Sequence, residues 1–155
     1  MAGFELLDLE GAPFAFVGRV CAARDVGDAV SQGFAALSAA FAKAGAAPSG
    51  PPLAHFRPSE SDAIFVELGF PVSEGALPGL RAAGLGVGKT PSGQVLSATH
   101  EGGYEGLRQT YDAMLAHMRA QGLTPAADTW ESYGGGETVE VRVIWPLVEA
   151  SFADF

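Results

Sequence analysis

Two stretches of the chain repeat their apolar residues with the period of an amphipathic helix. In the first stretch, apolar side chains recur at i, i+4, i+7 and i+11, which predicts a helix over about 28–44 that ends at Gly45. The second stretch predicts a helix over about 104–121 that ends at Gly122. The apolar stripes consist of Val30, Phe34, Leu37 and Phe41 in the first helix and of Leu107, Tyr111, Met114, Leu115 and Met118 in the second.

Short apolar runs and alternating segments predict strands on both sides of each helix. The expected strands cover residues 14–21, 53–57 and 63–72 around the first helix and residues 94–100, 129–133 and 138–145 around the second. The intervening residues 73–93 are rich in Gly and Pro, and we expect a flexible loop there. This loop includes a Gly-Lys-Thr sequence at 88–90, but Ala83 stands where a phosphate-binding loop requires glycine.

The two halves of the chain, about 10–72 and 94–147, repeat the order strand, helix, strand, strand. Gly45 corresponds to Gly122 with an offset of 77 residues, and Pro71 corresponds to Pro146 with an offset of 75. The repeat predicts an α+β fold in which duplicated βαββ units form one antiparallel sheet, with both helices on one face and a central cleft. We expect one domain over residues 1–155.

The composition of the chain excludes several classes of function. The 155 residues include 9 Lys and Arg against 18 Asp and Glu, and this excess of negative charge argues against a nucleic-acid partner. A lone Cys21 cannot form an internal disulfide, and the three histidines have no metal-ligand spacing, so we expect neither a metal nor a cofactor. The acidic N-terminus does not resemble a signal peptide, and no apolar run is long enough to span a membrane, which favours a soluble cytoplasmic protein.

The segment 128–133, Asp-Thr-Trp-Glu-Ser-Tyr, places a carboxylate between large aromatic side chains. On a strand, Glu131 shares one face with Thr129 and Tyr133, while Trp130 and Ser132 face the other way. An inward-facing carboxylate would need a hydrogen-bond partner, a raised pKa or a cationic ligand. The pattern alone leaves a solvent-facing Glu131 and a cation site both open.

Over essentially its whole length, the chain resembles the GyrI-like small-molecule-binding domain, which also forms the effector-binding part of AraC-type and MerR-type regulators. The resemblance includes the duplicated βαββ layout and is most specific in the second half of the chain. The resemblance rests on His-Glu-Gly-Gly-Tyr at 100–104, on Trp-Glu-Ser-Tyr at 130–133 and on a final strand that ends in Trp-Pro-Leu at 145–147. Two features depart from the family pattern. Gly103 stands in place of a usual proline, and a glycine triplet at 134–136 replaces a usual acidic-proline turn.

This resemblance implies a central cleft for hydrophobic, often cationic molecules. Glu131 matches the buried counter-charge of the family, and Tyr104 matches a tyrosine whose hydroxyl points into the cleft. Phe56 precedes Pro71 by 15 residues, as Glu131 precedes Pro146, and is therefore its pseudo-symmetric counterpart. The further candidate ligand-binding residues are Tyr133, Trp130, His100 and His55.

Three functions remain open from the sequence. No DNA-binding segment precedes the domain, so we expect a stand-alone protein that binds drugs or toxins for sequestration or sensing. The same cleft could instead serve a hydrolase of reactive cyclopropane-type alkylating compounds, with Glu131 as general base and Tyr104 as acid. The third alternative is a protein-binding module that resembles gyrase inhibitors and has a protein partner.

Overall fold

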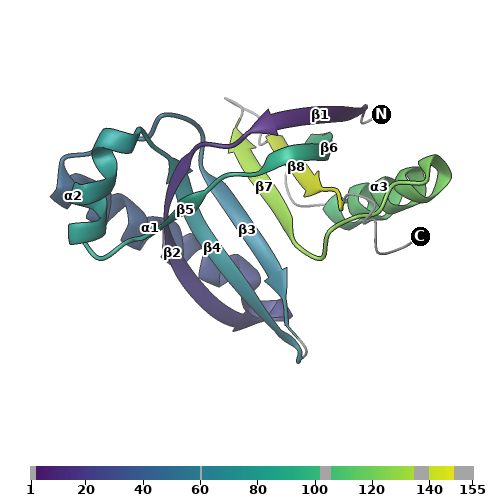
Figure 1. The fold of residues 1–155 in the computed structure, drawn as a ribbon. Helices are drawn as coiled ribbons and strands as arrows, with labels where there is room; N and C mark the ends of the chain where they lie inside the picture. The colour runs from purple at the N-terminus through teal and green to yellow at the C-terminus, as the bar shows by residue number, and fades with distance from the viewer. Residues whose placement is uncertain (1–2, 60, 102–105, 135–139, 149–155) are drawn as a thin grey trace.

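The computed structural model describes residues 3–59, 61–101, 106–134 and 140–148. Within these residues, eight strands form one antiparallel sheet in the order β1-β6-β8-β7-β3-β4-β2-β5 (Figure 1). The strands are β1 (Phe4–Glu10), β2 (Pro13–Ala22), β3 (Leu53–Pro58), β4 (Ala63–Pro71), β5 (Gly86–Lys89), β6 (Ser92–Glu101), β7 (Thr129–Gly134) and β8 (Glu140–Pro146). The predicted α+β class with one antiparallel sheet is confirmed.

The two long helices follow the predicted apolar stripes. Helix α1 (Val26–Ala44) ends at Gly45 with φ of 64°, and α3 (Leu107–Gln121) ends at Gly122 with φ of 70°. Both glycines adopt the left-handed conformation that terminates a helix at little steric cost. The predicted start of the second helix at residue 104 lies outside the described residues. No helix in the described part of the chain is long and apolar enough to cross a membrane.

The sheet is built from two copies of the predicted βαββ unit. The first copy is β2-α1-β3-β4 and the second is β6-α3-β7-β8, and the copies meet where β3 pairs with β7. The outer strands are exchanged between the copies, because β1 precedes β2 but pairs with β6, whereas β5 precedes β6 but pairs with β2. Where the two connections meet, the Ala12 amide donates to the Thr90 hydroxyl and the Thr90 amide donates to the Ala12 carbonyl, both at 2.8 Å.

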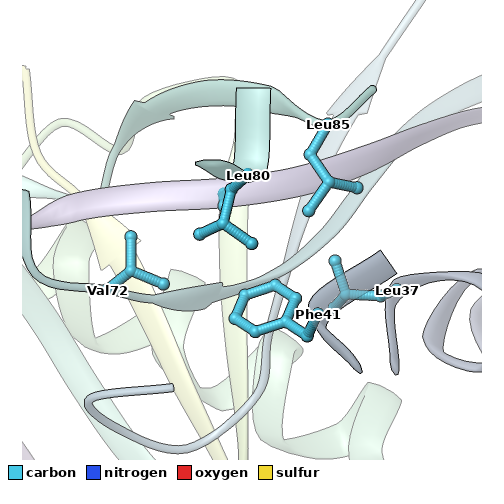
Figure 2. Close-up of a cluster of buried hydrophobic side chains, with 6 residues drawn as sticks. Leu37, Phe41, Val72, Leu80 and Leu85 are labelled. Atoms are coloured by element: carbon cyan, nitrogen blue, oxygen red, sulfur yellow. The ribbon is translucent and has the colours of Figure 1, made fainter. Parts of the chain in front are cut away.

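The prediction of a flexible loop over 73–93 is wrong. This segment forms a 3-10 turn (Glu74–Ala76), the short helix α2 (Leu77–Ala82) and β5. Leu80 and Leu85 pack with α1 in a buried cluster, shown in Figure 2. A six-residue helix and a four-residue strand are too short to display a hydrophobic period. The glycines of β5 also interrupt the run of apolar side chains by which a strand is recognised. One of these glycines is needed because a Cβ at Gly86 would lie 2.6 Å from the Phe16 ring.

Strand β1 is an element that the sequence analysis did not predict. It pairs with β6 along its whole length, from Phe4 opposite Ala98 to Glu10 opposite Ser92. The pattern of this segment did not indicate a strand, because acidic residues are uncommon in strands. They suit an edge strand, since exposed charges oppose pairing with another chain.

Both helices cover the same face of the sheet. Helix α1 packs over β2 and β4, and α3 packs over β6 and β8 (Figure 1). The core beneath α3 contains Leu96, Ala98, Met114, Met118, Val143 and Trp145. A smaller cluster of Phe14, Leu53 and Trp130 lies on the opposite face of the central strands. The predicted placement of both helices on one face is confirmed.

Candidate functional site

A cavity of about 470 Å³ lies where the two helices approach the central strands. Its volume is within the range of small-molecule sites in proteins. Each helix contributes one side of the lining, and β3, β4 and β7 contribute the sheet side. The lining residues are Val26, Gly27, Val30, Phe56, Ile64, Leu107, Tyr111, Thr129, Glu131 and Tyr133.

Glu131 is the charged residue of this cavity lining, and its side chain is almost fully enclosed. The residue is only 6% exposed. The Tyr111 hydroxyl donates to Oε2 at 2.6 Å, and the Tyr133 hydroxyl donates to Oε1 at 2.7 Å. Two O–H donors suit an ionised carboxylate, because that group only accepts hydrogen bonds. Within the described residues, no Lys, Arg or His forms an ion pair with Glu131.

The Tyr111 hydroxyl remains a neutral donor. Burial raises the pKa of Tyr111 well above its ordinary value, and the negative charge of Glu131 and the hydrogen bond to it raise the pKa further. A phenol that keeps its proton stabilises the carboxylate without cancelling its charge. The cavity therefore combines apolar walls with a negative charge that no described cation balances.

Aromatic contacts hold the two tyrosines from opposite sides of the cavity. The Tyr133 ring meets Phe34 of α1 edge-on, with 6.1 Å between ring centroids. The Tyr111 ring meets Trp145 of β8 in the same manner at 5.7 Å. Edge-to-face packing of this kind favours one ring orientation over others. The hydroxyls are thus directed at Glu131 by both halves of the molecule.

Three of the residues singled out in the sequence line this cavity together. Glu131 and Tyr133 alternate along one face of β7, as predicted, and Phe56 reaches the cavity from β3. Tyr104, the other residue matched to the family pattern, lies outside the described residues.

The other candidates lie away from the cavity. Trp130 and His55 are on the opposite face of the sheet, because strand neighbours of cavity residues point the other way. Their rings stack with centroids 4.0 Å apart. His100 lies near the start of α3, where its Nδ1 is 3.0 Å from the Thr110 hydroxyl, and it is not part of the cavity lining.

Tyr111 is the site residue that the sequence reasoning missed. It was assigned to the apolar stripe of the second helix, and its ring does occupy that stripe. The Tyr111 hydroxyl could have indicated this role, because a buried tyrosine hydroxyl needs a hydrogen-bond partner. Glu131 was already a candidate for an inward-facing carboxylate. The described residues contain no group of three or more His, Cys, Asp or Glu side chains arranged to hold a metal ion.

No family model matches the sequence, and no curated protein matches it. Solved structures share the fold, among them these three. A hydrolase from Listeria innocua aligns over 94% of this chain and 91% of its own, with a TM-score of 0.67 and 15% identity. SAV2435 bound to tetraphenylphosphonium aligns over 94% of each chain, with a TM-score of 0.64 and 11% identity. The EcmrR C-terminal domain aligns over 97% of this chain and 98% of its own, with a TM-score of 0.66 and 14% identity.

Proposed function

We propose that this chain is a small-molecule-binding domain of the GyrI-like type, which takes up a hydrophobic cation in the cavity around Glu131. The observation that carries the proposal is a buried carboxylate that accepts hydrogen bonds from two tyrosine hydroxyls in a mainly apolar cavity. Sequestration or sensing of a drug or toxin would follow from such binding.

The chemistry of the cavity favours a bulky cation over a neutral ligand of the same shape. Both ligands would gain from apolar contact with residues such as Val30, Phe56 and Leu107. Only the cation would gain from the charge of Glu131 and from the aromatic faces of Phe56 and the tyrosines, where a cation–π contact contributes about 0.5–2 kcal/mol. Charge would therefore decide between ligands of equal size.

The fold comparison gives independent support. SAV2435 has the same fold and is bound to tetraphenylphosphonium, which is a large hydrophobic cation. This compound is therefore a suitable first probe for the cavity.

Binding measured by calorimetry tests the proposal, with tetraphenylphosphonium compared against neutral triphenylphosphine oxide. Glu131→Gln keeps the side-chain shape and removes the charge, so we expect the affinity for the cation to fall by roughly tenfold or more, about 1.4 kcal/mol. The affinity for the neutral compound should stay nearly constant. Glu74→Gln, which removes an exposed charge outside the cavity lining, is the matched control and should leave both affinities unchanged. Equal losses for both compounds in Glu131→Gln would contradict the proposal.

A hydrolase is the second candidate, because a carboxylate and phenols meet in the cavity as the hydrolysis of a reactive cyclopropane requires. Glu131 would take a proton from water while the water oxygen bonds to one ring carbon. The carbon–carbon bond that breaks would leave its electron pair on the neighbouring carbon, which would take a proton from a phenol. Tyr111 is a candidate for this acid role alongside Tyr104, since its hydroxyl lies 2.6 Å from the Glu131 carboxylate. Repeated turnover that is lost in Glu131→Gln and Tyr111→Phe would favour this candidate over simple binding.

A further inference from the structure

On the sheet face opposite the cavity, His55 lies between two carboxylates. Its Nδ1 is 2.9 Å from Glu67 Oε1 on β4, and its Nε2 is 2.6 Å from Asp128 Oδ2, directly before β7. We call Glu67, His55 and Asp128 the strap. Its histidine side chain is only 12% exposed, and none of its three residues lines the cavity. The proposed function therefore leaves the strap without a role.

The geometry of the strap favours a protonated histidine. A neutral imidazole has one N–H group, whereas both ring nitrogens here face a carboxylate acceptor at hydrogen-bond distance. Loss of the proton would set a nitrogen lone pair against a carboxylate oxygen. The hydrogen bond from His55 lowers the pKa of Glu67, in keeping with a charged pair.

Among the described residues, Arg57 and Trp130 also contact the strap. Arg57 Nη2 on β3 lies 3.4 Å from Glu67 Oε2, and the Trp130 ring on β7 stacks against the imidazole at an interplanar angle of 12°. Histidine is the side chain in this group that ordinarily changes charge near neutral pH. A change of pH in that range would therefore act on the strap through His55.

The strap crosses the junction between the two halves of the molecule. Strands β3 and β7 pair only from Phe56 opposite Thr129 to Leu53 opposite Ser132, which is four residue pairs. Strands β2 and β4, within the first half, pair over nine positions. The strap joins β4 and β3 of the first half to the residue that precedes β7 of the second. It therefore adds a charged link at a short junction.

The same two strands form the sheet side of the cavity on their other face. Phe56 follows His55 on β3, and Thr129 and Glu131 flank Trp130 on β7, so all three cavity residues are sequence neighbours of strap or stacking residues. A shift of β3 along or away from β7 would change the separation of Phe56 and Glu131. Ligand affinity depends on how well such walls are held in place beforehand.

We propose that His55 is a positioning residue, which as an imidazolium ties β3 to β7 and thereby holds Phe56 and Glu131 in the geometry that binds ligand. The effect on affinity rests on the proposed function, whereas the effect on the β3–β7 junction does not. Because the strap is complete only with a proton on both ring nitrogens, we expect the affinity to be higher in mildly acidic than in mildly alkaline solution. By linkage, ligand binding takes up a proton in that range.

Two measurements on the full chain test this role. The affinity for tetraphenylphosphonium, whose charge does not depend on pH, is measured between pH 5.5 and 8.5, and we expect a decrease of roughly fivefold or more. His55→Gln and Asp128→Asn should flatten this profile. His117→Gln, which changes a histidine that packs on Phe4, is the control and should keep the wild-type slope. Amide hydrogen exchange of the ligand-free protein, corrected for intrinsic rates, should show β3 and β7 losing protection relative to β2 and β4 over the same pH range.

The outcomes separate the two proposals. An identical pH slope in wild type and in the two strap variants, or equal changes in exchange throughout the sheet, overturns the role of His55. If His55→Gln does not fold, Asp128→Asn and the wild-type exchange profile decide the question. If tetraphenylphosphonium does not bind at any pH, the proposed function fails instead. In that case, selective loss of protection at β3 and β7 on raising the pH still supports the strap, and uniform exchange overturns it.

Discussion

The two faces of strands β3 and β7 each hold an enclosed ionisable side chain between two hydrogen-bond partners, but the partners differ in charge. On the cavity face, Glu131 accepts hydrogen bonds from two neutral phenols. On the opposite face, His55 lies between two carboxylates, and Arg57 contacts one of them. Neutral partners stabilise a charge and leave it able to attract a ligand, whereas charged partners cancel it. The first arrangement suits binding and the second suits a structural link.

The largest effect should come from removing both hydroxyls on the cavity face. In the double variant Tyr111→Phe with Tyr133→Phe, an enclosed carboxylate loses both of its donors, so we expect the free energy of unfolding at neutral pH to fall by about 2–5 kcal/mol. Urea denaturation of the double and the two single variants measures this. Each single variant should lose less than the double variant, and unchanged stability in the double variant would mean that the phenols do not support the charge of Glu131.

On the opposite face, removing the charge should lower stability without changing ligand preference. His55→Gln leaves Glu67 and Asp128 without their shared cation, and we expect the free energy of unfolding near pH 6.5 to fall by about 1–3 kcal/mol. The preference for a cation over a neutral ligand should remain, because Glu131 is unaltered. If His55→Gln abolished that preference, the two faces would not have the separate roles of ligand binding and structural support.

The smallest effect concerns the alkaline pH range. The pKa of Tyr111 is raised in the folded protein, so the stabilisation linked to its proton is complete below the ordinary tyrosine pKa of about 10 and decreases as the pH rises above it. Wild-type stability should therefore decrease between about pH 9.5 and 11 more steeply than that of Tyr111→Phe. Thermal unfolding of both proteins across this pH range measures the difference. If stability decreases with pH equally in wild type and Tyr111→Phe, the pKa of Tyr111 is the same in the folded and unfolded states.

Local patterns in the sequence predicted much of this arrangement. The alternation along 129–133 placed Glu131 and Tyr133 on one face and Trp130 on the other, and the apolar stripes located both long helices. These features depend on periods of two and 3.6 residues, which a short window of sequence contains. The assignment of residues 73–93 to a loop failed because α2 and β5 are shorter than such a window.

The hydrogen-bond partners could not be predicted in the same way. His55 bonds to Glu67, 12 residues away, and to Asp128, 73 residues away, and both contacts exist only because the strand order brings β4, β3 and β7 together. Tyr111 likewise meets Glu131 from a different element, 20 residues away. The local pattern of apolar and polar residues predicts which face of a strand or helix a side chain occupies. Its hydrogen-bond partner depends instead on how strands and helices that are distant in the sequence pack together.

We expect the charge of Glu131, left unbalanced by its neutral partners, to be the counter-charge for a cationic ligand in the cavity. A crystal structure of the protein with tetraphenylphosphonium would show where the cation binds. We expect the phosphorus atom between α1 and α3, within roughly 6 Å of the Glu131 carboxylate, a distance at which opposite charges interact strongly. A bound cation on another surface of the protein, with the cavity around Glu131 unchanged and empty, would show that Glu131 is not the counter-charge.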